Sequence, residues 1–201
     1  MILSNPIKKF WFILILCLVW NVVFSQRHQK VVYDKEGIKI YNPPLESGFI
    51  SYTAYLALPG KTVHQVRNVF QDYKAHTEWI YRCLESEKIS ETDGVVYLYQ
   101  VSRSNWPFKN RDHILVIQIL DDSNNKYRIR FKAEPTFLDY HNRHVRIDDF
   151  YGEWEVSQEE SGVLVKMFTS FNPKVNFPKA FFRTLSKRVP LETLRKLKAK
   201  L

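Results

Sequence analysis

The chain has 201 residues, 45% of them hydrophobic and 15% aromatic, and carries a formal net charge of +9. A chain of this composition can bury a core without covalent cross-links. Its six glycines do not cluster, which excludes a glycine-rich phosphate-binding loop.

The first 25 residues have the pattern of a secretory signal peptide. Lys8 and Lys9 precede an unbroken apolar run, Phe10–Val19, and Val23-Phe24-Ser25 offers a small-residue cleavage site before Gln26. Even with its continuation the run reaches only about fifteen residues, short of the roughly 20 that a spanning helix needs. An uncleaved anchor is the alternative. We expect cleavage and an exported protein, periplasmic or secreted.

Residues 26–201 are then one folded domain. Only Cys83 remains in it, so no intramolecular disulfide can form. Without an obvious neighbouring base, Cys83 is expected to be a buried small hydrophobe, not a nucleophile.

The domain begins with strands and then becomes helical. Two short strands are predicted within Lys30–Tyr41 and a longer one at Phe49–Leu58. A helix follows, because Thr62 can cap it and Gln65 can complete a capping box. A short helical turn carrying Trp79 comes next.

Strands dominate the middle of the chain, with further ones predicted at Gly94–Arg103, His113–Leu120, Lys126–Glu134 and Gly162–Phe171. Lys126–Glu134 alternates basic and apolar residues without fault, which indicates a sheet with one solvated face. Between His144 and Val156 the apolar positions change from odd to even at Asp148-Asp149, which predicts a β-bulge there.

The last predicted element is a long amphipathic helix that starts near Pro178. Its apolar positions are Phe177, Phe181, Leu185, Leu191, Leu194, Leu197 and Leu201. Pro190 lies inside it, and since proline cannot donate its backbone hydrogen bond, the helix should kink or restart there.

Residues 179–201 hold eight basic residues and one acidic residue, so the charge excess of the mature chain lies entirely on this helix. An anionic membrane surface is the partner that this suggests. An ordinary solvated helix face is the alternative. The residues expected to contact the membrane are Lys179, Arg183, Lys187 and Arg188.

The elements add up to an α+β domain with roughly seven strands, mostly sequential and therefore antiparallel. One pair of helices is inserted early and one long helix comes last. A twisted sheet of this kind tends to curl around its closing helix, and a space can remain between them.

Five pieces of the sequence, in this order, resemble the START domain, the lipid-transfer domain of the helix-grip superfamily. They are "GIKIY" (Gly37–Tyr41), "NVFQDYKAHTEW" (Asn68–Trp79), "WPFKNRDHI" (Trp106–Ile114), "YGEWEV" (Tyr151–Val156) and the closing helix in Asn172–Leu197. The residues that carry the motifs are Trp79, Arg111, Asp112, Gly152 and Trp154.

The resemblance implies a curved antiparallel sheet wrapped around the long C-terminal helix, with a ligand cavity between them. It also implies that the protein binds one lipid or other apolar small molecule there, and that it can transfer this ligand, with the helix as a lid. From strand parity and this resemblance, the residues expected at the cavity or lid are Tyr97, Tyr99, Trp106, Phe131, Met167, Phe181 and Leu185.

Adjacent Arg111 and Asp112 enter a predicted strand on opposite faces, so they cannot simply pair with each other. Each needs another partner. We expect both to serve the fold, bonding backbone groups or opposite charges at the edge of the sheet.

One departure from the family bears on the ligand. Sterol-binding members place an acid and an arginine in the tunnel at positions that correspond here to Leu98 and Ile117. The resemblance therefore favours a fatty acid, a phospholipid or another apolar ligand over a sterol.

Catalysis is the main alternative, because the superfamily also contains cyclases and hydrolase-like members. We expect no enzyme, no cofactor and no metal, since His141 and His144 point to opposite faces of an extended segment and lack a third ligand. Nucleic acid is not expected either, because bases and aromatic residues are not interleaved on the predicted faces. A monomer is expected. A scaffold whose interior is filled by side chains is the third possibility.

Overall fold

The computed structural model describes residues 30–43, 48–139 and 143–201. Their strands are β1 (Lys30–Lys35), β2 (Ile38–Asn42), β3 (Ile50–Pro59), β4 (Cys83–Thr92), β5 (Val95–Ser102), β6 (Arg111–Asp122), β7 (Lys126–Ala133), β8 (Val145–Arg146), β9 (Phe150–Glu159) and β10 (Gly162–Phe171). The helices are α2 (Val63–Gln71), α3 (His76–Trp79) and α4 (Lys179–Lys200). The expected signal peptide and His141 lie outside the described residues.

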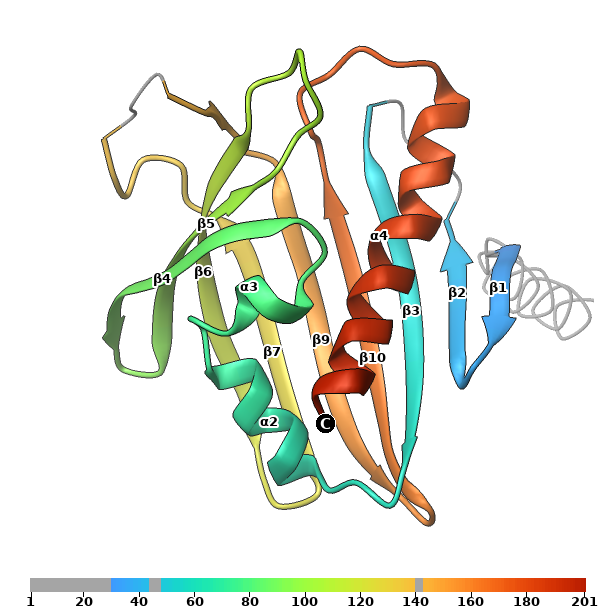
Figure 1. Cartoon of the computed structure of the whole chain (residues 1–201). Helices are drawn as coiled ribbons and strands as arrows, with labels where there is room; N and C mark the ends of the chain where they lie inside the picture. Colours follow the sequence, from blue (N-terminus) through green and yellow to red (C-terminus); the bar gives the residue numbers. More distant parts are fainter. Residues whose placement is uncertain (1–29, 44–47, 140–142) are drawn as a thin grey trace, which may run out of the picture.

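All the described strands belong to one sheet, in the order β1-β2-β3-β10-β9-β7-β6-β5-β4, with every neighbouring pair antiparallel. The short strand β8 pairs with β6 in parallel. The sheet curves around α4, and α2 and α3 lie on the same side of it (Figure 1). The predicted α+β helix-grip architecture is therefore confirmed.

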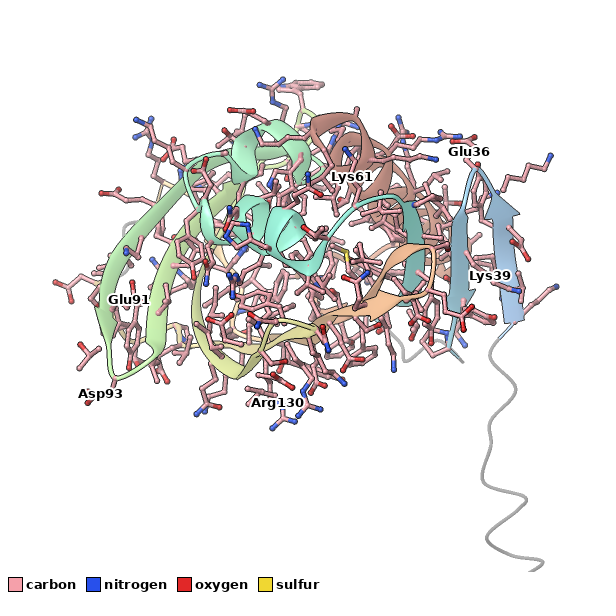
Figure 2. All side chains as sticks on the ribbon, turned by 90° about the horizontal axis from the view of Figure 1, so that it is seen from below. Glu36, Lys39, Lys61, Glu91, Asp93 and Arg130 are labelled. Carbon is pink, nitrogen blue, oxygen red and sulfur yellow. The ribbon has the colours of Figure 1, made fainter. Side chains whose placement is uncertain are left out.

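The two faces of the sheet differ because the strands alternate. In β7 the side chains of Tyr127, Ile129 and Phe131 are buried in the core. Arg130, between them in sequence, points away from the interior (Figure 2) and forms an ion pair with Glu153 at 3.0 Å. The solvated outer face predicted from this strand is confirmed.

Local signals in the sequence account for the first helix. The Thr62 hydroxyl accepts a hydrogen bond from the backbone N–H of Gln65 at 3.3 Å, and the Gln65 side chain accepts one from the backbone N–H of Thr62 at 3.0 Å. This is the predicted capping box. Strand β4 was not predicted because it is a largely polar strand at the edge of the sheet, where charged residues are common.

The predicted bulge is wrong, and of the two alternatives predicted at Pro190, a kink or a restart, the restart is wrong. No bulge occurs at Asp148-Asp149: the chain leaves β8, beside β6, and enters β9, between β7 and β10, so the change of parity marks a change of strand. The helix does not restart at Pro190 either, since α4 is continuous from Lys179 to Lys200. A proline inside a helix costs about 3 kcal/mol, and the buried Leu191, Leu194 and Leu197 each contribute roughly 1.5–3 kcal/mol on burial, which offsets it.

The START-like motif residues hold neighbouring parts of the sheet together. A Cβ on Gly152 would lie 2.4 Å from the Phe168 carbonyl oxygen and 2.5 Å from the ring of Phe131, so only glycine fits there. Trp79 is fully buried and stacks on Phe70 with ring centroids 5.5 Å apart. Trp154 contacts the same pair of rings.

The adjacent charges of β6 do take separate partners. Asp112 faces the outer side of the sheet, is only 3% exposed, and accepts two hydrogen bonds from Arg146, from Nε at 2.9 Å and from a terminal nitrogen at 2.8 Å. Arg146 also donates to the Pro135 carbonyl, which ties the following loop to the sheet. Arg111 faces inward and donates to the Pro173 carbonyl at 3.2 Å and the Ser104 hydroxyl at 2.8 Å.

We expect Asp112→Asn to lower the free energy of unfolding by about 3–5 kcal/mol, because it removes the charge of the carboxylate that accepts two hydrogen bonds from the buried Arg146 guanidinium. Urea denaturation of the purified protein measures this. Arg130→Gln is the matched control, since it removes a surface ion pair and should cost less than about 1 kcal/mol. Equal losses in the two variants would contradict a fold-bearing role for Asp112.

Candidate ligand-binding cavity

A cavity of about 550 Å³ lies between the inner face of the sheet and α4. Small-molecule sites in proteins typically measure roughly 300–1,000 Å³. Its wall is mainly apolar and comes from seven strands and from the three helices. Its lining residues include Tyr52, Leu98, Leu115, Ile117, Ile129, Phe131, Trp154, Leu185 and Val189.

The position of α4 leaves this space open. One side of the helix, with Phe182, Ser186 and Leu194, is buried in the core and packs against β2 and β3. Ser186 fixes it there, since its hydroxyl accepts a hydrogen bond from the backbone N–H of Ser51 at 3.2 Å. Another side, with Leu185 and Val189, faces the cavity instead.

Four of the residues predicted at the cavity line it: Trp106, Phe131, Phe181 and Leu185. Their role in binding a ligand stays a prediction. Both positions that correspond to the polar pair of sterol-binding members, Leu98 and Ile117, also belong to the wall.

Three predicted residues do not line the cavity. Tyr97 and Tyr99 were placed on the wrong face of β5, since Leu98 and Gln100 are the residues that face inward. Tyr97 instead stacks on Phe137 of the outer loop at 3.9 Å between ring centroids. Met167 is fully buried in the core that includes Leu194, so packing closes it off from the cavity.

A chain of polar side chains, which the sequence analysis missed, crosses the wall at β5 and β6. His76 Nε2 lies 2.8 Å from the Phe70 carbonyl oxygen, and its Nδ1 lies 3.0 Å from the Gln100 amide nitrogen. The same nitrogen donates to the Ser86 hydroxyl at 3.0 Å. The Gln100 amide oxygen lies 3.2 Å from His113 Nε2. Strand alternation could have identified Gln100 and His113. Each lies two positions after a residue that faces inward, Gln100 after Leu98 and His113 after Arg111.

Burial sets the protonation of these groups. Loss of hydration lowers the pKa of His76 to about 4 and that of His113 to about 4, so both imidazoles are neutral at neutral pH. On the opposite side of the cavity, burial raises the pKa of Tyr52 to about 12, and its phenol shares a hydrogen bond with Thr169. These three groups are therefore uncharged at neutral pH, whereas the lining also includes the charged guanidinium groups of Arg82, Arg103, Arg111 and Arg188.

Four aromatic side chains of the cavity lining, the exposed Trp106, Phe108 and Phe181 and the half-buried Phe177, form a group that we call the aromatic rim. Trp106 is 92% exposed and Phe181 is 41% exposed. Phe177 joins the two segments, with its ring 5.2 Å from that of Phe108 and 4.3 Å from that of Phe181. The β5–β6 loop and the start of α4 meet at this end of the molecule (Figure 1).

The basic residues of α4 fall into two groups. Near its end, Arg195 pairs with Glu36 at 2.7 Å and Lys198 donates to the Glu36 carbonyl at 2.8 Å, so these charges hold the helix to the β1–β2 turn. Of the four predicted membrane contacts, Lys187 and Arg188 lie over the rings of Tyr33 and Tyr81. The other two, Lys179 and Arg183, are exposed on the first turns of the helix, in the segment that carries Phe181 of the aromatic rim.

Groups that could perform covalent chemistry are few in the described part of the chain. Cys83 is a free, buried cysteine, and burial raises the pKa of its thiol to about 11, which keeps it un-ionised. No group of three or more metal-binding side chains occurs within residues 30–43, 48–139 and 143–201. In the same ranges, none of the helices has the length and apolar character required to cross a bilayer.

The buried histidines predict a pH-dependent stability. A histidine in the unfolded chain has a pKa of about 6.5, so below that value the unfolded state binds protons that the fold excludes, and stability falls as the pH drops toward 4. We expect a loss of about 2 kcal/mol per histidine between pH 7 and pH 5. Urea denaturation across this range measures it. His113→Phe should roughly halve the slope, and a flat profile would contradict the burial of neutral imidazoles.

Comparisons with known proteins agree with this geometry. No protein-family model matches the chain. Its sequence is 22% identical over 173 residues to an uncharacterized protein of Pseudomonas aeruginosa, with 85% of each chain covered.

Solved structures resemble it closely in shape. A STAR-related lipid transfer protein from Xanthomonas axonopodis matches with a TM-score of 0.75 and 24% identity, covering 86% of this chain and 97% of that one. Human STARD10 matches with a TM-score of 0.73 and 16% identity, covering 89% and 76%. StfQ, a di-domain ARO/CYC protein of the steffimycin biosynthetic pathway, matches with a TM-score of 0.53 and 10% identity. The match covers 75% of this chain and 50% of that one. The chain therefore has the START-like, helix-grip fold that its sequence motifs predicted.

Proposed function

We propose that this START-like domain binds one lipid, or another apolar small molecule of similar size, in the cavity beneath α4. The observation that carries the proposal is a mainly apolar cavity of about 550 Å³ whose lining includes the aromatic rim. Burying an apolar chain there removes it from water, which is the dominant favourable contribution to such binding. The solved STAR-related lipid transfer protein with the same fold supports it by analogy of shape.

We further propose that the rim docks on an anionic membrane, where the ligand enters and leaves. Trp106 and Phe181 are large apolar side chains that water surrounds in the free protein. Tryptophan in particular favours the headgroup level of a bilayer. Lys179 and Arg183 add positive charge beside them, each worth about 1 kcal/mol near an anionic surface. Export of the chain, as its first residues predict, would place this exchange outside the cytoplasm.

Binding without catalysis is part of the proposal. Both nitrogens of His76 are engaged within the wall, on the Phe70 carbonyl and on Gln100. The Cys83 thiol stays protonated because burial raises its pKa to about 11. Neither group is therefore available as a general base or nucleophile. Turnover of an aromatic or polyketide-like substrate that is lost in a His113 variant would favour the cyclase-like alternative.

We expect Leu98→Trp to fill part of the cavity and to abolish co-purification of lipid. The matched control is Tyr97→Trp, one residue away on the outer face of β5, which should retain the lipid. Solvent extraction of each purified variant, with lipid quantified per mole of protein by mass spectrometry, gives the comparison. Circular dichroism checks that both fold. Equal lipid content in the two variants would contradict a ligand in this cavity.

We expect Trp106→Ala to weaken binding to vesicles that contain phosphatidylserine by about tenfold, because an exposed indole can no longer enter the interface. Lys179→Gln with Arg183→Gln should weaken it by a similar factor at low salt and by less at high salt. Co-sedimentation measures both effects. Tyr151→Ala, an exposed aromatic on the outer face, is the control and should bind normally. If the Tyr151 variant weakened binding as much as the Trp106 variant, docking through the rim would be wrong.

A further inference from the structure

The hydrogen-bonded series His76–Gln100–His113 in the wall begins at a backbone carbonyl oxygen. This group determines where the protons lie along the series. The Phe70 carbonyl oxygen can only accept a hydrogen bond, so His76 Nε2, 2.8 Å away, carries the proton. The imidazole is neutral, because burial lowers its pKa to about 4. Its Nδ1 is therefore an acceptor and receives a hydrogen bond from the Gln100 amide nitrogen at 3.0 Å.

The orientation of Gln100 passes this assignment on to His113. Both N–H groups of the Gln100 amide are used, one on His76 and one on the Ser86 hydroxyl at 3.0 Å. The Gln100 oxygen is left facing His113 Nε2 at 3.2 Å, and an amide oxygen can only accept. His113 Nε2 consequently carries the proton, and Nδ1 of the same neutral ring carries only a lone pair.

That lone pair has no partner from the protein. His113 is 4% exposed, its ring lines the cavity, and none of the described residues donates a hydrogen bond to its Nδ1. The ring is held in place by stacking on Phe150, with centroids 4.7 Å apart and planes 26° apart. Among the described residues, this nitrogen is not one of the side-chain atoms that are both fully buried and unpartnered, so it is open to a donor inside the cavity.

The surroundings restrict what the donor can be. Leu98, Leu115 and Ile117 line the same part of the wall and offer no polar group. Arg111 precedes His113 on the inner face, but its Nε and one terminal nitrogen already donate to Pro173, Ser104 and Lys109. A fully ionised headgroup has no proton to donate to this lone pair.

We propose that the ligand is a neutral lipid with a hydroxyl group, and that this hydroxyl donates a hydrogen bond to Nδ1 of His113. The inference rests on the proposed function, since it names the class of lipid that the cavity selects. Gln100 and His76 are positioning residues in it: they hold the tautomer of His113 that leaves Nδ1 free to accept. An ester or hydrocarbon of the same length fits the apolar wall but leaves the acceptor unmatched.

Three probes with the same chain length test the inference on the delipidated full chain: hexadecanol, methyl hexadecanoate and hexadecanoate. Each competes with Nile red for the cavity, and dye fluorescence reports the affinity. We expect hexadecanol to bind about tenfold tighter than the methyl ester, the difference made by one buried hydrogen bond. In His113→Phe, which keeps an aromatic ring beside Phe150 but has no acceptor, the two should bind equally. Leu115→Val, on the same face, should weaken both probes by the same factor.

Nitrogen NMR of the wild-type protein with labelled histidine gives a second readout that does not depend on a variant folding. Hexadecanol should move the resonance of the unprotonated His113 nitrogen upfield, and the methyl ester should not. Equal affinities for alcohol and ester in the wild type, without this change, would overturn the inference while leaving lipid binding intact. Preference for hexadecanoate that survives in His113→Phe would overturn it as well, by showing a carboxylate site elsewhere. Failure of the dye and all three probes to bind would remove the proposed function itself.

Discussion

The hollow interior follows from a mismatch of widths between one helix and a broad sheet. An α-helix with its side chains is about 10–12 Å across, whereas neighbouring strands lie about 4.8 Å apart, so a single helix covers little more than two strands. Here α4 packs against β2 and β3 at one side of the curve. The short helices α2 and α3 cover only part of the inner face of β5, β6 and β7, where α2 contacts β7 and His76 of α3 bonds Gln100 of β5. A cavity is what remains.

Much of the fold could be predicted from the sequence because its signals are local. The alternation in β7 and the capping box at Thr62 each depend on a few adjacent residues. The errors arose where an outcome depends on distant partners. Pro190 is tolerated because buried leucines hold α4 against the sheet, and the parity change at Asp148 marks a move between two pairs of strands. The neighbouring sequence reveals neither the sheet that α4 packs against nor the strands that β8 and β9 pair with.

The site was harder to predict than the fold for the same reason. Alternation shows that Tyr97 and Leu98 face opposite ways but not which of them faces the cavity, and the prediction chose the wrong one. The polar chain joins α3, β5 and β6, and it can be seen only once His76 lies beside Gln100. Two neutral imidazoles in an apolar wall combine a hydrophobic interior with one directional contact. That combination would let an apolar cavity discriminate between ligands that have the same hydrocarbon chain but different polar groups.

The central claim is that the cavity between the sheet and α4 holds a guest. Native mass spectrometry of the full-length protein, purified without detergent, tests it most directly. The account predicts a species heavier than the bare chain by the mass of one lipid, which is released as the collision energy rises. A spectrum of bare protein alone, unchanged after incubation with lipid vesicles, would contradict it.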